Sequence, residues 1–251
     1  MIKIRNLTKS YNGKKVVDNV SVNIERGKIT SLIGPNGAGK STVLSMITRL
    51  IKPDSGEVII DGKKISEYDS NSLSKKIAIL KQSNNIDVKL RVRELVEFGR
   101  FPYCKGNLGK EDHRLVDEAI EYMQLGDIQD KYLDELSGGQ RQRAFIAMVI
   151  AQDTEYILLD EPLNNLDMYN SSKMMKVLKN LCRDLNRTIV IVLHDINFAS
   201  CYSDNIVALK NGKIEKEGCT ENIIEKETLD NIYEMDFTIK NINGNRICVY
   251  F

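Results

Sequence analysis

Residues 136–140 read LSGGQ, and they lie between GPNGAGKS at residues 34–41 and ILLDE at residues 157–161. The GPNGAGKS string fits the phosphate-loop pattern GxxxxGK[ST], whose backbone N–H groups and lysine surround the phosphates of a nucleotide. Residues 29–33 have the composition of a short buried strand, and residues 41–50 have the apolar spacing of a helix. Strand, loop and helix in this order are the context that the pattern requires. The alternative, a glycine-rich turn that arises by chance, does not account for these flanks.

Each type of residue in the phosphate loop has a predicted role in binding a nucleotide. Glycine permits the conformations with which the loop turns its N–H groups inward, and the positive end of the following helix faces the same anion. We expect Lys40 to contact the β- and γ-phosphates of ATP, and Ser41 to ligate Mg²⁺. The predicted nucleotide-binding residues at this loop are Gly34, Pro35, Asn36, Gly37, Ala38, Gly39, Lys40, Ser41 and Thr42.

Asp160 and Glu161 follow an apolar run at residues 156–159 that predicts a short strand. In open α/β sheets, ligands bind beyond the carboxyl ends of such strands. We expect Asp160 to hold Mg²⁺ through water, and Glu161 to act as the general base that polarises the attacking water. The alternative is that both carboxylates only cap a loop before Pro162. Acidic residues after a strand are common, so the pair gains its meaning from the phosphate loop on the same chain.

The LSGGQ string offers a second anion site. Ser137, Gly138 and Gly139 supply a hydroxyl and backbone N–H groups directly before a predicted helix, and Gln140 completes the set. A single protomer needs only one γ-phosphate site, so the second site is useful when it closes over ATP bound to another copy. The alternative is ordinary capping of the helix by Ser137, and we expect both roles.

The phosphate loop, LSGGQ continued by RQRA at residues 141–144, and the Asp-Glu pair together resemble the ATP-binding cassette (ABC) family. The resemblance covers nearly the whole chain. It implies an α/β fold of the phosphate-loop NTPase class, with a RecA-like core, an antiparallel β subdomain and an inserted α-helical subdomain. The implied single ABC ATPase domain, residues 1–251, has its core and β subdomain in 1–82 and 156–219, its helical subdomain in 83–155 and a small appendage in 220–251.

The apolar patterns along the chain are typical of this organisation. The predicted strands are 2–7, 16–24, 29–33, 77–80, 156–159 and 188–193, with hairpins at 57–65 and 205–216 and helices at 41–50, 111–125, after residue 139, and 171–185. In the helix at 111–125, we expect an apolar face that consists of Leu115, Ala119, Tyr122 and Met123.

The resemblance implies further site residues at matching positions. Tyr11 stands where the family places an aromatic ring against adenine, with an ordinary strand-end tyrosine as the alternative. Gln82 matches the Q-loop glutamine, which touches Mg²⁺ and the attacking water and reports to a transmembrane partner. His194 follows a predicted strand and matches the switch histidine at the γ-phosphate. Asn165 and Asp167 match the D-loop, which crosses the interface of a dimer.

One segment departs from the family pattern. Residues 163–165 read Leu-Asn-Asn, where the family more usually has a sequence that contains threonine and serine. The position of Asp167 is kept. We therefore expect ATP hydrolysis to be retained, and the D-loop contacts between protomers to differ.

A second set of similarities narrows the class of transporter. GRFPY at residues 99–103 resembles the GRxPY segment of ATPases that serve importers of ferric siderophores, haem and cobalamin. Residues 138–154 and 193–214 are similar to the siderophore group, and the Asn-Asn variant is similar to its petrobactin-type subset. The resemblance implies a bacterial ATPase subunit at the cytoplasmic face of the membrane. Its implied partners are a second copy, a membrane permease and, indirectly, a substrate-binding protein.

Other functions compete with siderophore import. An ATPase for haem or cobalamin import differs only in cargo. A soluble ABC ATPase of translation usually carries two cassettes, and one of DNA repair needs a long coiled-coil insertion, for which 251 residues leave no room. A regulator that binds nucleotide without turnover is disfavoured by the presence of Glu161 and His194.

The composition of the chain bears on which partners and cofactors we expect. The 36 lysines and arginines balance 35 aspartates and glutamates, so a net charge of +1 gives no reason to expect nucleic acid. The five cysteines form no CxxC pair, and the two histidines are far apart, which argues against a disulfide framework or a zinc site. The longest apolar run, 144–151, is far shorter than the roughly 20 residues of a membrane span. We therefore expect another polypeptide to supply the span, and ATP and Mg²⁺ to be the cofactors.

Overall fold

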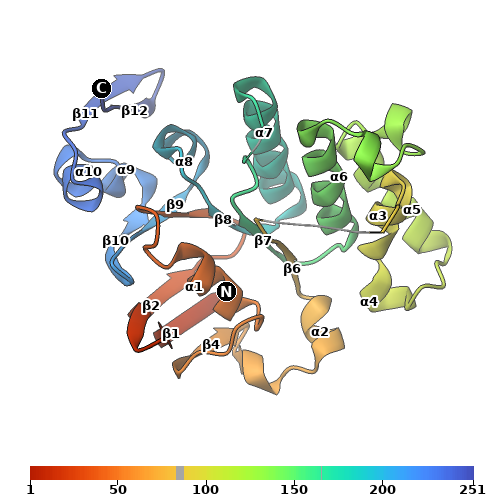
Figure 1. The fold of residues 1–251 in the computed structure, drawn as a ribbon, viewed down its shortest axis with the longest axis horizontal. Helices are drawn as coiled ribbons and strands as arrows, with labels where there is room; N and C mark the ends of the chain where they lie inside the picture. The colour runs from red at the N-terminus through yellow and green to blue at the C-terminus, as the bar shows by residue number, and fades with distance from the viewer. Residues whose placement is uncertain (83–87, 165) are drawn as a thin grey trace.

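A six-stranded, mainly parallel sheet forms the centre of the molecule (Figure 1). The computed structural model describes residues 1–82, 88–164 and 166–251, and the sheet has the order β10-β9-β3-β8-β7-β6. Its strands are β3 (Ile29–Ile33), β6 (Ile77–Leu80), β7 (Tyr156–Asp160), β8 (Thr188–Val192), β9 (Asn205–Lys210) and β10 (Lys213–Cys219). The first five pair in parallel, and β10 is antiparallel to β9. Every residue of β3, β7 and β8 is buried, as expected of parallel strands that are covered on both faces.

A smaller, antiparallel sheet has the order β2-β1-β4-β5. Its strands are β1 (Ile2–Tyr11), β2 (Lys14–Ile24), β4 (Ser55–Ile60) and β5 (Lys63–Lys64). Their apolar side chains pack with those of α1 (Lys40–Ile47) in one hydrophobic cluster. Asp61 and Gly62 have positive φ angles of 51° and 85°, which the tight turn between β4 and β5 requires.

Between β6 and β7 the chain forms a helical block. Its helices are α3 (Val92–Phe98), α4 (Phe101–Cys104), α5 (Lys110–Tyr122) and α6 (Gly138–Ala151). The buried face of α5 consists of Val116, Ala119 and Ile120, while Leu115 and Tyr122 are only half-buried. The face predicted for this helix was therefore wrong in part. The reason is that α5 packs against both α3 and α6. These two contacts bury the side of the helix that carries Val116 and Ile120.

The remaining elements complete the layers. They are α2 (Ser70–Ser74), α7 (Met168–Leu185), α8 (Ile196–Tyr202), α9 (Thr220–Ile223), α10 (Lys226–Tyr233), β11 (Thr238–Ile242) and β12 (Asn245–Val249). Figure 1 shows the β11–β12 hairpin and the helical block at opposite ends of the molecule. The predicted α/β architecture, with an antiparallel β subdomain and an inserted helical subdomain, is confirmed. Element ends differ by a few residues, because fraying and capping are weakly encoded in the apolar pattern.

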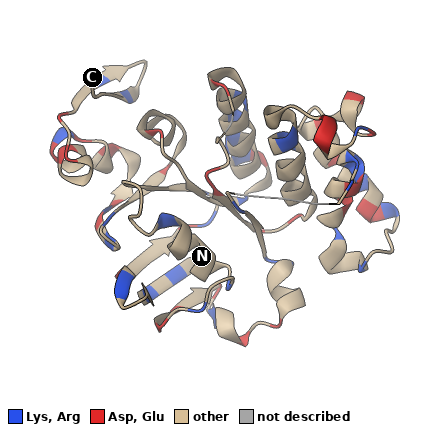
Figure 2. Ribbon diagram, viewed as in Figure 1, with Lys and Arg blue, Asp and Glu red and all other residues tan. Residues whose placement is uncertain are grey.

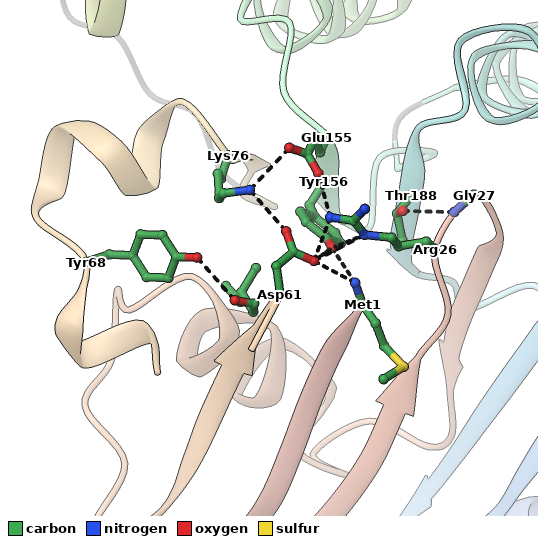
Figure 3. A network of polar contacts seen from close by, with 10 residues as sticks. Met1, Arg26, Gly27, Asp61, Tyr68, Lys76, Glu155, Tyr156 and Thr188 are labelled. Carbon is green, nitrogen blue, oxygen red and sulfur yellow. Dashed lines mark hydrogen bonds and ion pairs between the residues drawn. The ribbon is translucent and has the colours of Figure 1, made fainter. Parts of the chain in front are cut away.

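A polar network joins the smaller sheet to the central one (Figure 3). Asp61 accepts hydrogen bonds from Arg26, Lys76, the Tyr156 hydroxyl and the Met1 amino group, and the Tyr156 and Met1 bonds measure 2.5 and 2.8 Å. Burial raises the pKa of Asp61, but these donors outweigh that effect and hold the pKa well below its usual range. The network fixes the β4–β5 turn against the start of β7.

Charged side chains of both signs are spread along the chain, including the helical block and the C-terminal elements (Figure 2). Within residues 1–82, 88–164 and 166–251, no helix has the length and hydropathy to cross a membrane.

Candidate functional site

The phosphate loop lies between β3 and α1, as predicted. Gly34 and Gly39 have φ angles of 137° and 97°. A Cβ at Gly34 would lie 2.0 Å from the Leu209 carbonyl oxygen, and one at Gly39 would lie 2.6 Å from the Val16 carbonyl oxygen. Both positions therefore require glycine for the local conformation and for the close approach of the neighbouring backbone.

Lys40 is buried under this loop, with 5% of its surface exposed. Its Nζ donates hydrogen bonds to the carbonyl oxygens of Gly34 at 2.7 Å and Pro35 at 2.9 Å. Burial lowers the pKa of Lys40, and the charges of Glu161 and Asp160 oppose that shift. The ammonium group thus lies inside the loop, within reach of an anion that the loop would enclose.

Ser41 and Asp160 meet beside the loop. The Ser41 hydroxyl donates a 2.8 Å hydrogen bond to Asp160 Oδ1. Burial raises the pKa of Asp160, and the bond from Ser41 counteracts it. A hydroxyl and a carboxylate are the oxygen ligands that Mg²⁺ combines with substrate phosphates, so these two residues fit that ion.

Glu161 is the centre of a polar cluster, and 9% of it is exposed. Its Oε2 accepts 2.6 Å hydrogen bonds from Gln82 Nε2 and Asn164 Nδ2, and its Oε1 lies 2.5 Å from His194 Nε2. Gln82, Glu161 and His194 follow β6, β7 and β8, which are neighbours in the sheet. The parallel strands thus bring the three predicted catalytic residues together at one edge, although 33 or more residues separate each in sequence.

Asn164 is a member of this cluster that sequence reasoning missed. The Leu-Asn-Asn segment departs from the family pattern, but the sequence predicts its effect at contacts between protomers and not at Glu161. The Asn164 backbone N–H donates to the Glu161 carbonyl oxygen at 3.2 Å, so a tight turn places its amide against the carboxylate of Glu161. The spacing of three residues after the expected base was the available signal.

A hollow of about 280 Å³ opens at this cluster. Its lining includes Glu161, Asn164, His194, Asp195 and Phe198. A larger hollow of about 600 Å³ lies between α5 and α7 and contains none of the predicted site residues.

Ser137 caps α6 through a reciprocal pair of bonds. Its Oγ accepts from the Gln140 N–H at 3.3 Å, and Gln140 Oε1 accepts from the Ser137 N–H at 3.0 Å. Ser137 and Gly138 are exposed, and Gly139 and Gln140 are half-buried. The predicted capping role is thus present in the structure, and the role of these residues toward nucleotide stays a prediction.

The remaining predicted site residues lie as follows. Asp167 caps α7, because its Oδ1 accepts a 2.7 Å bond from the Asn170 N–H, and Asn165 lies outside the described residues. The ring of Tyr11 is 44% exposed, with Lys9 Nζ 5.6 Å from its centroid. Their roles at a dimer interface and at adenine stay predictions.

Comparison with known proteins agrees with this geometry. Residues 17–164 match the family model described as ABC transporter. The chain is 61% identical, over 100% of both chains, to the petrobactin import ATP-binding protein YclP of Bacillus subtilis (strain 168). It is 47% identical, over 100% of both chains, to the petrobactin import ATP-binding protein FatE of Bacillus anthracis.

A solved structure shares both fold and sequence with this chain. It is the dimeric, post-hydrolysis state of the ATP-binding cassette MJ0796 with bound ADP and Pi. The two are 36% identical with a TM-score of 0.79, over 88% of this chain and 99% of that one. The predictions of an ATP-binding cassette fold and of an ATPase are thereby confirmed. With its phosphate loop, its LSGGQ-capped helix and its clustered strand-end residues, the chain belongs to the ABC transporter family.

Proposed function

We propose that this chain is the ATPase subunit of a bacterial importer for ferric siderophores, with petrobactin-type siderophores as the first candidates. The observation that carries the proposal is the 61% identity, over the full length of both chains, to a petrobactin import ATP-binding protein. A second protein named for petrobactin import is 47% identical over its full length. The GRFPY segment at residues 99–103 supports the same class of importer.

Two copies of the chain would bind ATP head to tail. Each nucleotide would lie between the phosphate loop of one copy and residues 137–140 of the other. The exposure of Ser137 and Gly138, which leaves the LSGGQ segment open to a second copy, supports this arrangement. The dimeric state of a cassette that is 36% identical supports it as well. Asn165 and Asp167 would lie at the same interface, and Tyr11 would pack against adenine.

Mg²⁺ would be held by Ser41 and Asp160, with Gln82 as a further oxygen ligand. The support for this site is the 2.8 Å bond that already pairs Ser41 with Asp160. The ion would neutralise charge on the β- and γ-phosphates. Lys40 would leave the carbonyl oxygens of Gly34 and Pro35 and turn to the same phosphates.

Glu161 would accept the proton of the attacking water as general base. Gln82, Asn164 and His194 contact its two carboxylate oxygens, so they can fix its orientation. His194 would then also face the γ-phosphate. Since phosphoryl transfer depends mainly on positioning and charge, holding the base still is the contribution that this cluster can make.

A membrane permease would dock on the helical block and hold the subunit at the cytoplasmic face of the membrane. Phe98 and Phe101 are 53% and 55% exposed, which is unusual for phenylalanine on a water-facing surface. They line a hollow of about 340 Å³ together with Leu90, Leu108, Glu94, Glu97, Cys104 and Gly106. An apolar hollow with two carboxylates suits an apolar segment that carries a basic residue.

The deciding experiment is uptake of labelled ferric petrobactin by iron-starved bacteria that carry the chain as the sole copy. Glu161→Gln should abolish uptake, whereas Glu118→Gln, the same change at an exposed position of α5, should leave it intact. Labelled haem and cobalamin would be tested in parallel. Loss of haem or cobalamin uptake with petrobactin uptake intact would contradict the siderophore assignment and select the other cargo.

A further inference from the structure

The C-terminal elements contact the phosphate loop directly. The Tyr233 hydroxyl, at the end of α10, accepts a 3.0 Å hydrogen bond from the backbone N–H of Gly34. Gly34 is buried at the point where β3 ends and the loop begins. A buried N–H group without a partner is costly, so this hydroxyl satisfies a requirement of the loop itself.

The peptide groups around Gly34 are held from two sides. The Tyr233 hydroxyl accepts a hydrogen bond from the N–H of Gly34, and Lys40 Nζ donates a 2.7 Å bond to the carbonyl oxygen of Gly34. The second contact ends when Lys40 turns to the phosphates, as the proposed function requires. The bond to Tyr233 does not involve the lysine, and it can hold the start of the loop while nucleotide is bound.

Tyr233 is itself fixed by its surroundings. Its ring lies 5.9 Å from the ring of Phe237, which is fully buried. The chain turns at Glu234, whose φ is 57°, and Glu234 forms a 2.9 Å ion pair with Lys210 at the end of β9. Burial raises the pKa of Tyr233 to about 12, so its hydroxyl stays neutral at physiological pH.

The hairpin that follows is tied to α8, the helix that begins after His194. Asn197 forms two bonds with the backbone of Cys248, at 3.2 Å to its carbonyl oxygen and at 2.8 Å from its N–H. Ser200 Oγ donates to the Arg246 carbonyl oxygen at 2.5 Å. The C-terminal elements therefore contact both the phosphate loop and α8, the helix that follows His194. These two sets of contacts hold Tyr233 in place.

We infer that Tyr233 is a positioning residue for nucleotide binding: through its hydrogen bond to Gly34, the segment after residue 219 sets the conformation of the phosphate loop. The inference rests on the nucleotide role proposed for residues 34–41. It assigns a function to a part of the chain in which neither the motifs nor the predicted site residues lie.

The test is calorimetric titration of the full chain with MgADP, for the native protein, Tyr233→Phe and Tyr250→Phe. Tyr233→Phe removes one hydroxyl and leaves the ring. We expect its Kd to rise about fivefold to tenfold, the equivalent of one net hydrogen bond. Tyr250→Phe, which removes a hydroxyl from another ring that packs against Phe237, should change the Kd by less than about twofold.

Two further measurements separate positioning from general stability. Thermal unfolding without nucleotide reports whether Tyr233→Phe is folded. In the complete transporter, the KM for ATP should rise in Tyr233→Phe while kcat changes little, since the hydroxyl touches no reacting group.

An unchanged Kd in Tyr233→Phe would overturn the inference. So would a native Kd with fewer binding sites and a lowered Tm, because this pattern means partial unfolding alone. Failure of the native chain itself to bind MgADP would instead overturn the role proposed for the phosphate loop, and the two failures are therefore distinguishable.

Discussion

Glu161 combines an uncommon backbone conformation with three polar neighbours. Its φ of 51° lies in the left-handed region, which residues other than glycine adopt infrequently. Such conformations persist where the surrounding structure holds them, and they occur often at functional sites. Here the bonds from Gln82 and Asn164 and the contact with His194 hold the side chain. The carboxylate contacts His194, which lies just after the end of β8.

At the residue scale, we predict that Asn164→Ala lowers kcat for ATP hydrolysis about tenfold and leaves the KM for ATP nearly unchanged. The mutation removes a bond to the expected base, and bonds to charged groups contribute about 1.5–3 kcal/mol. Steady-state ATPase assays on the complete transporter measure both constants. Asn231→Ala, at an exposed position of α10, is the control. A native kcat in Asn164→Ala would show that Gln82 and His194 suffice to hold the base.

A second prediction at this scale concerns Lys40. Lys40→Ala should weaken MgATP binding by tenfold or more, because the change removes the cation that lies inside the loop. Calorimetry on the full chain measures the affinity, with Lys173→Ala on α7 as the control. Unchanged affinity would remove Lys40 from the phosphate site.

At the scale of elements, the proposed function assigns the chemistry to residues at the strand ends and the coupling to a permease to the helical block. Strands β6, β7 and β8 each end at one catalytic candidate, and the chain between β6 and β7 carries the block. Gln82 therefore stands at the point where the core passes into the block. Gln82 Nε2 donates a 2.6 Å hydrogen bond to Glu161 Oε2. A movement of the block relative to the sheet would change this distance.

The surface at α3 and α4 gives a prediction at this scale. Phe98→Ser combined with Phe101→Ser should abolish co-purification with the permease, since the pair supplies the exposed apolar part of the hollow. Nucleotide binding by the subunit alone should remain native. Leu185→Ser, at a 51% exposed apolar position of α7, is the matched control. Retained permease binding in the double variant would place the docking surface elsewhere.

At the scale of the whole molecule, the network around Asp61 couples the two sheets. Asp61→Asn should lower the free energy of unfolding by about 1–3 kcal/mol near neutral pH, because it leaves Arg26 and Lys76 without their shared carboxylate. The folded pKa of Asp61 lies below its value in the unfolded chain, about 3.9. Its contribution is therefore complete above that value and is lost as the pH falls through the folded pKa.

Urea titrations at several pH values test this prediction. The difference in free energy of unfolding between the native protein and Asp61→Asn should be constant above about pH 5 and should become smaller at lower pH. Asp127→Asn, at an exposed position of the helical block, should show no such difference. If the two proteins differ in free energy of unfolding by the same amount at pH 3 and pH 7, the charge of Asp61 does not have the stabilising role assigned to it.

The sequence by itself determined the class of fold and predicted most residues of the candidate site. The phosphate loop, the LSGGQ string and Asp160-Glu161 are local motifs, and their chemistry depends on spacings of a few residues. Residues 189–193, IVIVL, form an uninterrupted apolar run that predicts a buried parallel strand directly, because both faces of such a strand are covered. Residues 29–33, ITSLI, are buried as well, although Thr30 and Ser31 are polar. Gln82 and His194 were predicted by resemblance alone, since no local pattern relates either residue to Glu161.

Contacts between distant segments were decided only by the tertiary structure. The hydrogen bond from Gly34 to Tyr233 comes from the packing of α10 against the start of the phosphate loop, far away in the sequence. The buried face of α5 was shifted by packing against two helices at once. Each of these depends on which surfaces meet, and the period of an apolar pattern does not specify the partner on the other side.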